Sequence, residues 1–351
     1  MVNGNMVNVS KIIDGLISGV SDRHRDILVG RFGLSKGGDT RTLADLGDQY
    51  GITRERVRQI ETDALALISE HLNSRNDIQE IIEKSLDHLR SVGGLKREDY
   101  FVNDLKFLFG DEALNPNQIR FLFAVSGSPY LYEDDDDYFD FWYVDEKVLD
   151  QAGEFIGFAG KFLADKKEHL IFQNKFAHLL EELAEAHKLS EFVALNYLIA
   201  SKKFGVNPYN DFGLSHWEEI NPKTIRSKAY LVLKKQGAPI HFRELSDLIN
   251  QISDSRKRAY AQTVHNELIK DPRVVLVGRG IYALKEHGFV PGTCQEVIVR
   301  ILKDKGPLTK DEVLDNISKQ RILKPNTIML NLQNKKHFQR TADGRYRLVR
   351  A

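Results

Sequence analysis

The 351-residue sequence predicts a mainly α-helical protein, in which a helix-turn-helix domain is followed by tandem winged-helix-like units, each an α+β unit with a short hairpin. Three observations support this fold class. Residues 21–72 place apolar helical faces on either side of a glycine turn. The rest of the chain repeats a unit of about 60 residues, in which helices precede a two-strand segment rich in aromatic residues. Basic residues concentrate in the last third of the chain.

Composition and length restrict the class of protein. Hydrophobic residues make up 42% of the chain and charged residues 28%, which excludes wholesale disorder. The single cysteine, Cys294, excludes an intramolecular disulfide and a cysteine-based zinc site. We predict five segments: a helix-turn-helix domain at 1–73, a winged-helix-like unit with an acidic hairpin at 74–150, a helical, winged-helix-like unit at 151–222, a winged helix at 223–287 and a basic winged-helix-like unit at 288–351.

The helix-turn-helix is predicted from its caps and glycines. A capped helix is expected over Ser21–Phe32, and a second helix opens at Thr42. Gly47 is small enough to permit close contact between helices, and Gly51 can adopt the positive φ of the turn. The third helix starts at Thr53.

The third helix has two distinct faces. At 100° per residue, its apolar face consists of Val57, Ile60, Ala64 and Leu67. Arginine and glutamine on the opposite face match the edges of guanine and adenine in the major groove. The DNA contacts predicted here are Arg41, Thr53, Arg54, Glu55, Arg58, Gln59 and Thr62. The alternative is a helix-turn-helix retained for packing or for protein docking.

The residues from Arg25 to Leu34, together with Thr42-Leu43 and Gly51–Glu61, resemble region 4 of bacterial primary sigma factors. The resemblance covers roughly residues 21–72 and implies that the third helix contacts the upstream promoter element. It also implies that the first helix lies against RNA polymerase, through Arg25, Leu28 and Arg31. Two departures limit it: residues 62–67 lack the basic residues usual in the family, and the remaining chain shows no aromatic, basic helices of the promoter-melting type. A complete sigma factor is therefore not predicted.

The clearest helix-and-hairpin repeats lie in the last part of the chain. In the first of them, helices are expected at Ile225–Lys235, His241–Ile252 and Arg256–Ile269, and strands at Arg273–Val277 and Ile281–Leu284. In the second, helices are expected at Cys294–Lys305, Lys310–Ser318 and Pro325–Asn334, and strands at His337–Arg340 and Arg345–Leu348. Fainter copies are predicted around Asn117–Val144 and Glu191–Trp217.

The copy at 224–286 contains KAYLVLKKQGAPIHFRELSDLI and VVLVGRGIYALKE, which resemble the HARE-type winged helix of the delta subunit of bacterial RNA polymerase. Members of that family bind polymerase, DNA or both, so the resemblance implies these two partners.

Charge is unevenly distributed along the chain. Residues 221–351 carry 26 Lys and Arg against 12 Asp and Glu, a net charge of +14, whereas residues 91–220 carry 12 against 24, a net charge of −12. A domain this basic is expected to bind a polyanion, and the alternative is a solvated surface around a core that includes Tyr260, Val264 and Leu268. The DNA contacts predicted in this half are Arg256, Lys257, Gln262, Thr263, Asn266, Arg279, Asn331, Lys335 and Lys336.

Six carboxylates lie at Glu133–Asp137 and Asp140. They could mimic nucleic acid, contact the basic end of the chain, enter a basic channel of polymerase, or form a hydrated hairpin tip. Enzyme motifs are not found: Gly157–Lys161 lacks the first glycine and the hydroxyl of a phosphate loop, and His169, His178 and His187 cannot meet on one helix. We predict no catalysis, cofactor, metal, small-molecule substrate or membrane association.

The sequence therefore predicts a cytoplasmic, nucleoid-associated transcription protein. Its expected partners are double-stranded DNA, bound sequence-specifically or at promoters, and core RNA polymerase. Two alternatives stay open: an architectural or DNA-processing accessory protein that binds duplex DNA without sequence preference, and a protein–protein scaffold.

Overall fold

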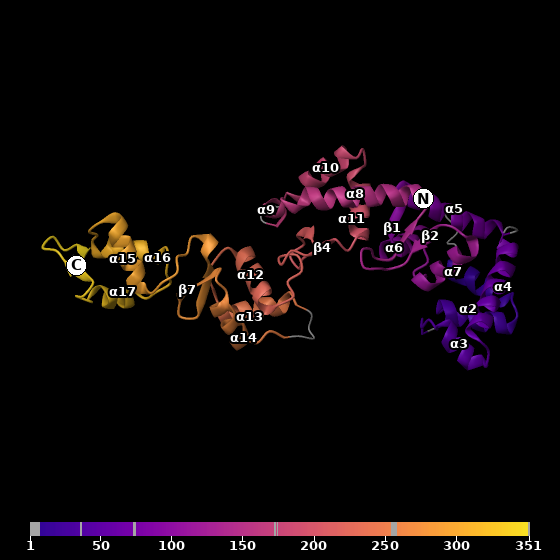
Figure 1. Cartoon of the computed structure of the whole chain (residues 1–351), viewed down its shortest axis with the longest axis horizontal. Helices are drawn as coiled ribbons and strands as arrows, with labels where there is room; N and C mark the ends of the chain where they lie inside the picture. The colour runs from indigo at the N-terminus through magenta and orange to yellow at the C-terminus, as the bar shows by residue number, and fades with distance from the viewer. Residues whose placement is uncertain are drawn as a thin grey trace. The chain divides into compact units, whose positions relative to one another are not determined.

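The computed structural model describes residues 8–35, 37–72, 75–171, 173, 175–253 and 258–349 (Figure 1). The chain divides into two compact units: unit 1 contains residues 1–170 and 174–205, and unit 2 contains residues 171–173 and 206–351. Across these described ranges, no helix is long and apolar enough to cross a membrane.

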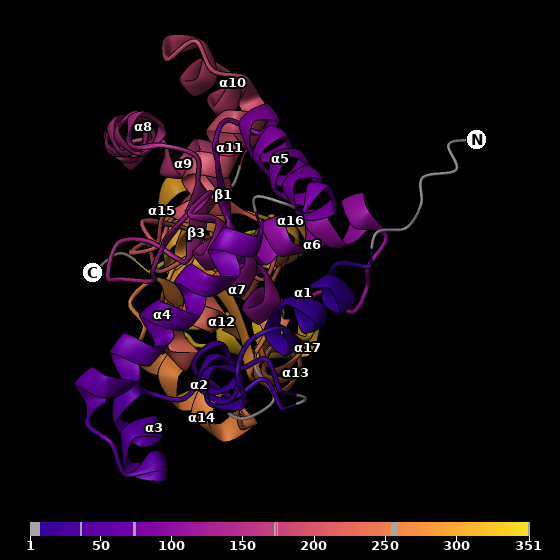
Figure 2. The same ribbon diagram turned by 90° about the vertical axis from the view of Figure 1, so that its right-hand side faces the viewer.

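Unit 1 begins with the predicted helix-turn-helix. Its helices are α1 Val9–Ser18, α2 Asp22–Phe32, α3 Leu43–Tyr50 and α4 Arg54–Leu72. Ser21 caps α2, and Thr42 forms a reciprocal capping box with Asp45 at the start of α3. Gly51 ends α3 with a φ of 63°, as predicted for the turn. In both views α2, α3 and α4 lie together (Figures 1 and 2).

The apolar face of α4 differs from the prediction at one position. Val57, Ile60 and Ala64 are buried, but Leu67 is 42% exposed and Ile68 is 2% exposed. From Ala64 onward the buried positions follow i, i+4 spacing, because this half of α4 packs into the core that contains α1 and α7.

The next elements of unit 1 form a winged helix. They are α5 Asn76–Ser91, β1 Leu95–Arg97, α6 Glu98–Phe109, α7 Pro116–Ser126, β2 Tyr130–Tyr132 and β3 Phe141–Tyr143. The three strands pair antiparallel in the order β1-β3-β2. This arrangement confirms the helix and hairpin predicted around Asn117–Val144. Part of the helix-turn-helix packs into the same hydrophobic core as this winged helix, through Leu28, Ala64, Ile68 and Leu72. The contact of α3 with α2 and α4 forms a separate, smaller cluster of Ile27, Leu46, Val57 and Ile60.

A helical segment completes unit 1 and leads into unit 2. It contains α8 Glu146–Ala164, α9 Lys167–Ile171, α10 Phe176–Ala186 and α11 Glu191–Ala200, followed by β4 Phe204–Val206 and β5 Phe212–Leu214. The predicted helix at Glu191–Ala200 is confirmed. Among the residues described here, no strand corresponds to β1, so the segment lacks the complete order of a winged helix.

Unit 2 contains two more copies of the helix-strand-helix-helix-strand-strand order. The first has α12 Ile225–Gln236, β6 Ile240–His241, α13 Phe242–Gln251, α14 Ala261–Lys270, β7 Val274–Gly278 and β8 Ile281–Leu284, and its sheet order is β6-β8-β7. A 3₁₀ turn, η1 Lys285–His287, follows. The second has α15 Cys294–Lys305, α16 Lys310–Ser318, α17 Pro325–Leu332, β9 Phe338–Arg340 and β10 Tyr346–Leu348. In this second copy, a single antiparallel bridge between Leu308 and Tyr346 stands where the first copy has strand β6.

The third helix of the first copy starts later than predicted. It begins at Ala261 instead of Arg256, and Tyr260 has extended backbone angles. The carbonyl oxygen of Ala259 accepts hydrogen bonds from Ser246 and Asn250, both at 2.9 Å, so tertiary contacts hold this segment outside the helix. Arg256 and Lys257, two of the predicted DNA contacts, lie outside the described residues.

Candidate nucleic-acid interface

The first half of α4 presents a polar, solvent-exposed face. Every DNA contact predicted on this helix is exposed: Thr53, Arg54, Glu55, Arg58, Gln59 and Thr62. The tight turn before α4 positions this face, because a Cβ on Gly47 would lie 2.7 Å from the carbonyl oxygen of Ile52. Only glycine allows α3 to approach the chain so closely.

Hydrogen bonds within α4 order its polar face. The Arg58 guanidinium contacts the Glu55 carboxylate at 2.6 Å, and this hydrogen bond lowers the pKa of Glu55. Arg56 Nη1 donates to Gln59 Oε1 at 3.0 Å, and Thr62 donates to the carbonyl oxygen of Arg58 at 2.9 Å. Arg56 is also exposed, although it was not among the predicted DNA contacts. Its place in the sequence between Glu55 and Gln59 could have indicated that it belongs to the same polar face.

Arg41 lies just before α3 and is also exposed. Its guanidinium donates to the side-chain carbonyl of Gln49, and its own carbonyl oxygen accepts from Arg31 Nη1 at 2.8 Å. The capping box beside it is electrostatically favourable, since the hydrogen bonds from Thr42 lower the pKa of Asp45. These hydrogen bonds link Arg41 to α3 and to α2.

The three residues predicted to contact polymerase have different environments. Leu28 is fully buried in the core of unit 1, so its prediction as a surface contact is wrong. Arg31 bonds to Glu61 at 3.2 Å and ties α2 to α4, which gives it a structural role. Arg25 retains 40% side-chain exposure beside Asp22 and can still reach a partner.

The winged helix at α12–β8 exposes a second polar face. Gln262, Thr263 and Asn266 of α14 are exposed, and Gln262 donates to Asn266 at 3.2 Å. Arg279 is exposed at the turn between β7 and β8. As an alternative to DNA contact, the sequence suggested a core that includes Tyr260, Val264 and Leu268. Val264 and Leu268 are buried as expected, but Tyr260 is 69% exposed, so its assignment to the core is wrong.

The last winged-helix-like unit presents mainly charge. Lys335 and Lys336 are exposed, and they follow the end of α17. Asn331 is partly buried, and its amide donates to the carbonyl oxygen of Thr327 at 2.8 Å, so this side chain is bonded to its own helix.

The winged helix of unit 1 differs from the two in unit 2. Its third helix, α7, packs against α2 and α4, and Ile119, Phe121 and Leu122 are fully buried. Its hairpin turn is the acidic segment. An exposed polar face like that of α14 is therefore absent from α7.

The acidic carboxylates tie their loop to other parts of unit 1. Asp134 contacts Lys202 at 2.8 Å, and Asp140 contacts Arg120 at 3.1 Å. Asp135 accepts a hydrogen bond from Tyr132, which raises the pKa of that phenol to about 12. These contacts show that the segment is an anchored loop rather than only a hydrated tip. Within the described ranges, no group of His, Cys, Asp or Glu has the arrangement of a metal site.

The fold and the exposed α4 define the first part of unit 1 as a helix-turn-helix of the DNA-binding type. Comparison with known proteins agrees: residues 16–70 match the family model of sigma-70, region 4. The chain is 40% identical over 70 residues to RNA polymerase sigma factor SigA1 of Synechococcus elongatus, covering 20% of this chain and 17% of that protein. It is 46% identical over 56 residues to RNA polymerase principal sigma factor HrdD of Streptomyces griseus, covering 16% and 17%.

A third relative, the chloroplastic RNA polymerase sigma factor sigF of Arabidopsis thaliana, is 39% identical over 62 residues, covering 18% of this chain and 11% of that protein. The chain thus spans less than one fifth of the length of the sigma factors it matches. The match to the family model, over residues 16–70, covers the helix-turn-helix.

Proposed function

We propose that this chain is a DNA-binding transcription protein that inserts α4 into the major groove and associates with RNA polymerase, without being a complete sigma factor. The observation that carries the proposal is the exposed, polar first half of α4 in a segment that matches sigma-70 region 4. The proposal includes no catalytic step and no cofactor.

The winged helices of unit 2 would extend the contact with DNA or polymerase. Their support is the exposed polar face of α14, the basic residues after α17 and the net charge of the last 131 residues, which hold 26 basic and 12 acidic side chains. The resemblance of residues 224–286 to the HARE-type winged helix points to the same two partners. A location on the nucleoid in the cytoplasm follows from these partners.

Replacing Arg58 or Gln59 by alanine tests the α4 face. Each good bidentate contact to a base contributes about 1–3 kcal/mol, so each change is expected to weaken binding to a promoter-like duplex roughly 5- to 150-fold. The measurement is fluorescence anisotropy with a labelled duplex at several salt concentrations, because phosphate contacts alone would change the salt dependence.

Arg90→Ala is the matched control. Arg90 lies on α5 and pairs with Asp87 three residues earlier, as Arg58 pairs with Glu55. Its loss is expected to leave affinity unchanged. Equal effects of the Arg58 and Arg90 changes would mean that only the overall charge determines affinity. Unchanged affinity in the Arg58 and Gln59 variants would show that α4 is not the helix that contacts DNA. Footprinting that protects DNA uniformly would favour the architectural alternative.

A further inference from the structure

Helix α6 of unit 1 is apolar on two opposite faces. Its inner face packs into the core of unit 1 through side chains that are at most 5% exposed: Phe101, Val102, Leu105 and Phe109. Its outer face carries Tyr100, Phe107 and Leu108, which are 45%, 90% and 44% exposed. A helix that is apolar all round is normally covered on every side, and exposed apolar patches commonly mark contacts with other proteins.

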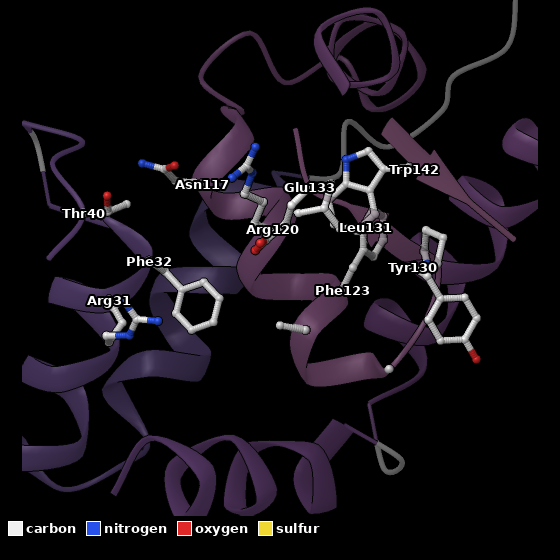
Figure 3. A pocket seen from close by; sticks show the side chains of 13 residues that line it. Arg31, Phe32, Thr40, Asn117, Arg120, Phe123, Tyr130, Leu131, Glu133 and Trp142 are labelled. Atoms are coloured by element: carbon white, nitrogen blue, oxygen red, sulfur yellow. The ribbon is translucent and has the colours of Figure 1, made fainter. Parts of the chain in front are cut away.

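The aromatic rings drawn in Figure 3 show the usual situation in this unit. Phe123 and Trp142 line a pocket between α7 and the β2–β3 hairpin, but they are only 1% and 2% exposed. They lie edge-on against each other, with 5.0 Å between the ring centroids, so their faces are used within the fold. Phe107 is the opposite case, because its ring projects into solvent. A partner that covers Phe107 would remove a large apolar surface from water, which is favourable.

The outer side chains of α6 form one stripe along the helix. Tyr100 and Phe107 are seven residues apart, so at 3.6 residues per turn they lie within about 20° of each other. Asn103, also exposed, lies between them along the helix. Asp99 and Lys106 are likewise seven residues apart, and they lie together on one side of the stripe. The stripe and its charged side therefore repeat over the same seven-residue step.

We propose that α6 is the contact between two molecules of this chain, which pair with their α6 helices antiparallel about a two-fold axis beside Asn103. Such an axis places Tyr100 of each molecule against Phe107 of the other, so that two aromatic contacts form. It also places Asp99 of each molecule near Lys106 of the other, which gives two pairs of opposite charge. The outer face of α6 is thus complementary to itself.

The charges on this face favour a second molecule of the chain over a partner of uniform charge. A basic helix laid along α6 would attract Asp99 but repel Lys106, and an acidic helix would do the reverse. Asp99 contacts Arg97 at 2.6 Å but keeps 54% of its side chain exposed, so it can reach a second cation. Asn103 offers both a donor and an acceptor near the axis, and a polar side chain within an apolar stripe fixes the register of paired helices.

An interface of one helix from each molecule is small. It is expected to bury less than the roughly 1,200 Å² at the lower end for stable complexes, so a dissociation constant of about 10–100 μM is expected. A dilute chain is then monomeric, and Phe107 contributes little to the stability of the single molecule. The inference goes beyond the proposed function, because a dimer presents two copies of α4 to a duplex with two half-sites. The test below contains no DNA and is independent of the role of α4.

The test is sedimentation velocity of the full chain from about 1 to 300 μM, a range that brackets the expected dissociation constant. The chain should shift from monomer to dimer. Phe107→Ala is expected to weaken association about tenfold or more, since aromatic anchors carry much of the binding free energy of an interface and each dimer loses two rings. Phe192→Ala is the matched control, because Phe192 is 53% exposed but belongs to α11; it should leave association unchanged. Circular dichroism checks that each variant is folded.

Charge reversals test the antiparallel pairing. Asp99→Lys and Lys106→Asp should each weaken association about three- to tenfold, because each creates two pairs of like charge across the axis. Both changes in one chain recreate pairs of opposite charge and should restore association, whereas two independent disturbances of the fold would add. A chain that stays monomeric over the whole range overturns the proposal. Association that Phe107→Ala leaves unchanged, or that the double reversal fails to restore, overturns it as well.

Discussion

Replacing Phe121 by alanine is expected to destabilise unit 1 by about 3–5 kcal/mol, the usual cost of truncating a fully buried phenylalanine. Phe121 belongs to α7, outside the segment that matches sigma-70 region 4. Its ring is completely buried and packs edge-on against Phe32 of α2, with 5.4 Å between the ring centroids. The loss should therefore reach the helix-turn-helix, and duplex binding should fail at temperatures where the original chain still binds.

Denaturant unfolding followed by circular dichroism measures the stability change, and anisotropy at increasing temperature measures the binding. Phe107→Ala is the control, because Phe107 on α6 is 90% exposed and its loss should change stability by no more than about 0.5 kcal/mol. If Phe121→Ala kept full stability and full duplex binding, α2–α4 would fold without help from α7, and the shared core would not matter for DNA binding.

Elements governed by neighbouring residues could be predicted from the sequence. The start of α3 depends on Thr42 and Asp45, three residues apart, and its end depends on Gly51. The exposed side of α4 follows from the helical period. The predicted bounds of α15 and α16 agree with the structure because each begins at a threonine cap that accepts from a glutamate N–H three residues later.

Features that depend on distant residues could not be predicted. The resemblance implied a polymerase contact by Leu28, but this side chain is buried in the core shared with α1, α5, α6 and α7. Phe32 of α2 packs edge-on against Phe121 of α7, far along the chain, and no local pattern indicates that they meet. The exposure of the third helix also differs among the winged helices for this reason. Packing against α2 and α4, which are distant in sequence, helps to remove α7 from solvent.

Replacing Gly47 by alanine is expected to destabilise the helix-turn-helix by about 2–3 kcal/mol, the upper part of the range for overpacking. The added Cβ would lie 2.7 Å from the carbonyl oxygen of Ile52 and 3.4 Å from the backbone nitrogen of Arg54. Backbone atoms cannot rotate away as a side chain can, so α3 or the turn must shift. That shift moves the start of α4, and duplex affinity should fall even where the variant remains folded.

Gly157→Ala provides the same chemical change with the opposite expected sign. Gly157 lies inside α8, and nothing is within 4 Å of a Cβ built there, so alanine should stabilise the chain by about 0.5–1 kcal/mol. Chemical unfolding of the two variants side by side therefore separates two effects on stability: the close contact of the added Cβ at position 47, and the general preference of helices for alanine. A Gly47 variant as stable as the Gly157 variant would mean that the α3–α4 turn is not constrained by this approach. A Gly47 variant that is less stable but binds duplex normally would separate the packing of the turn from the position of α4.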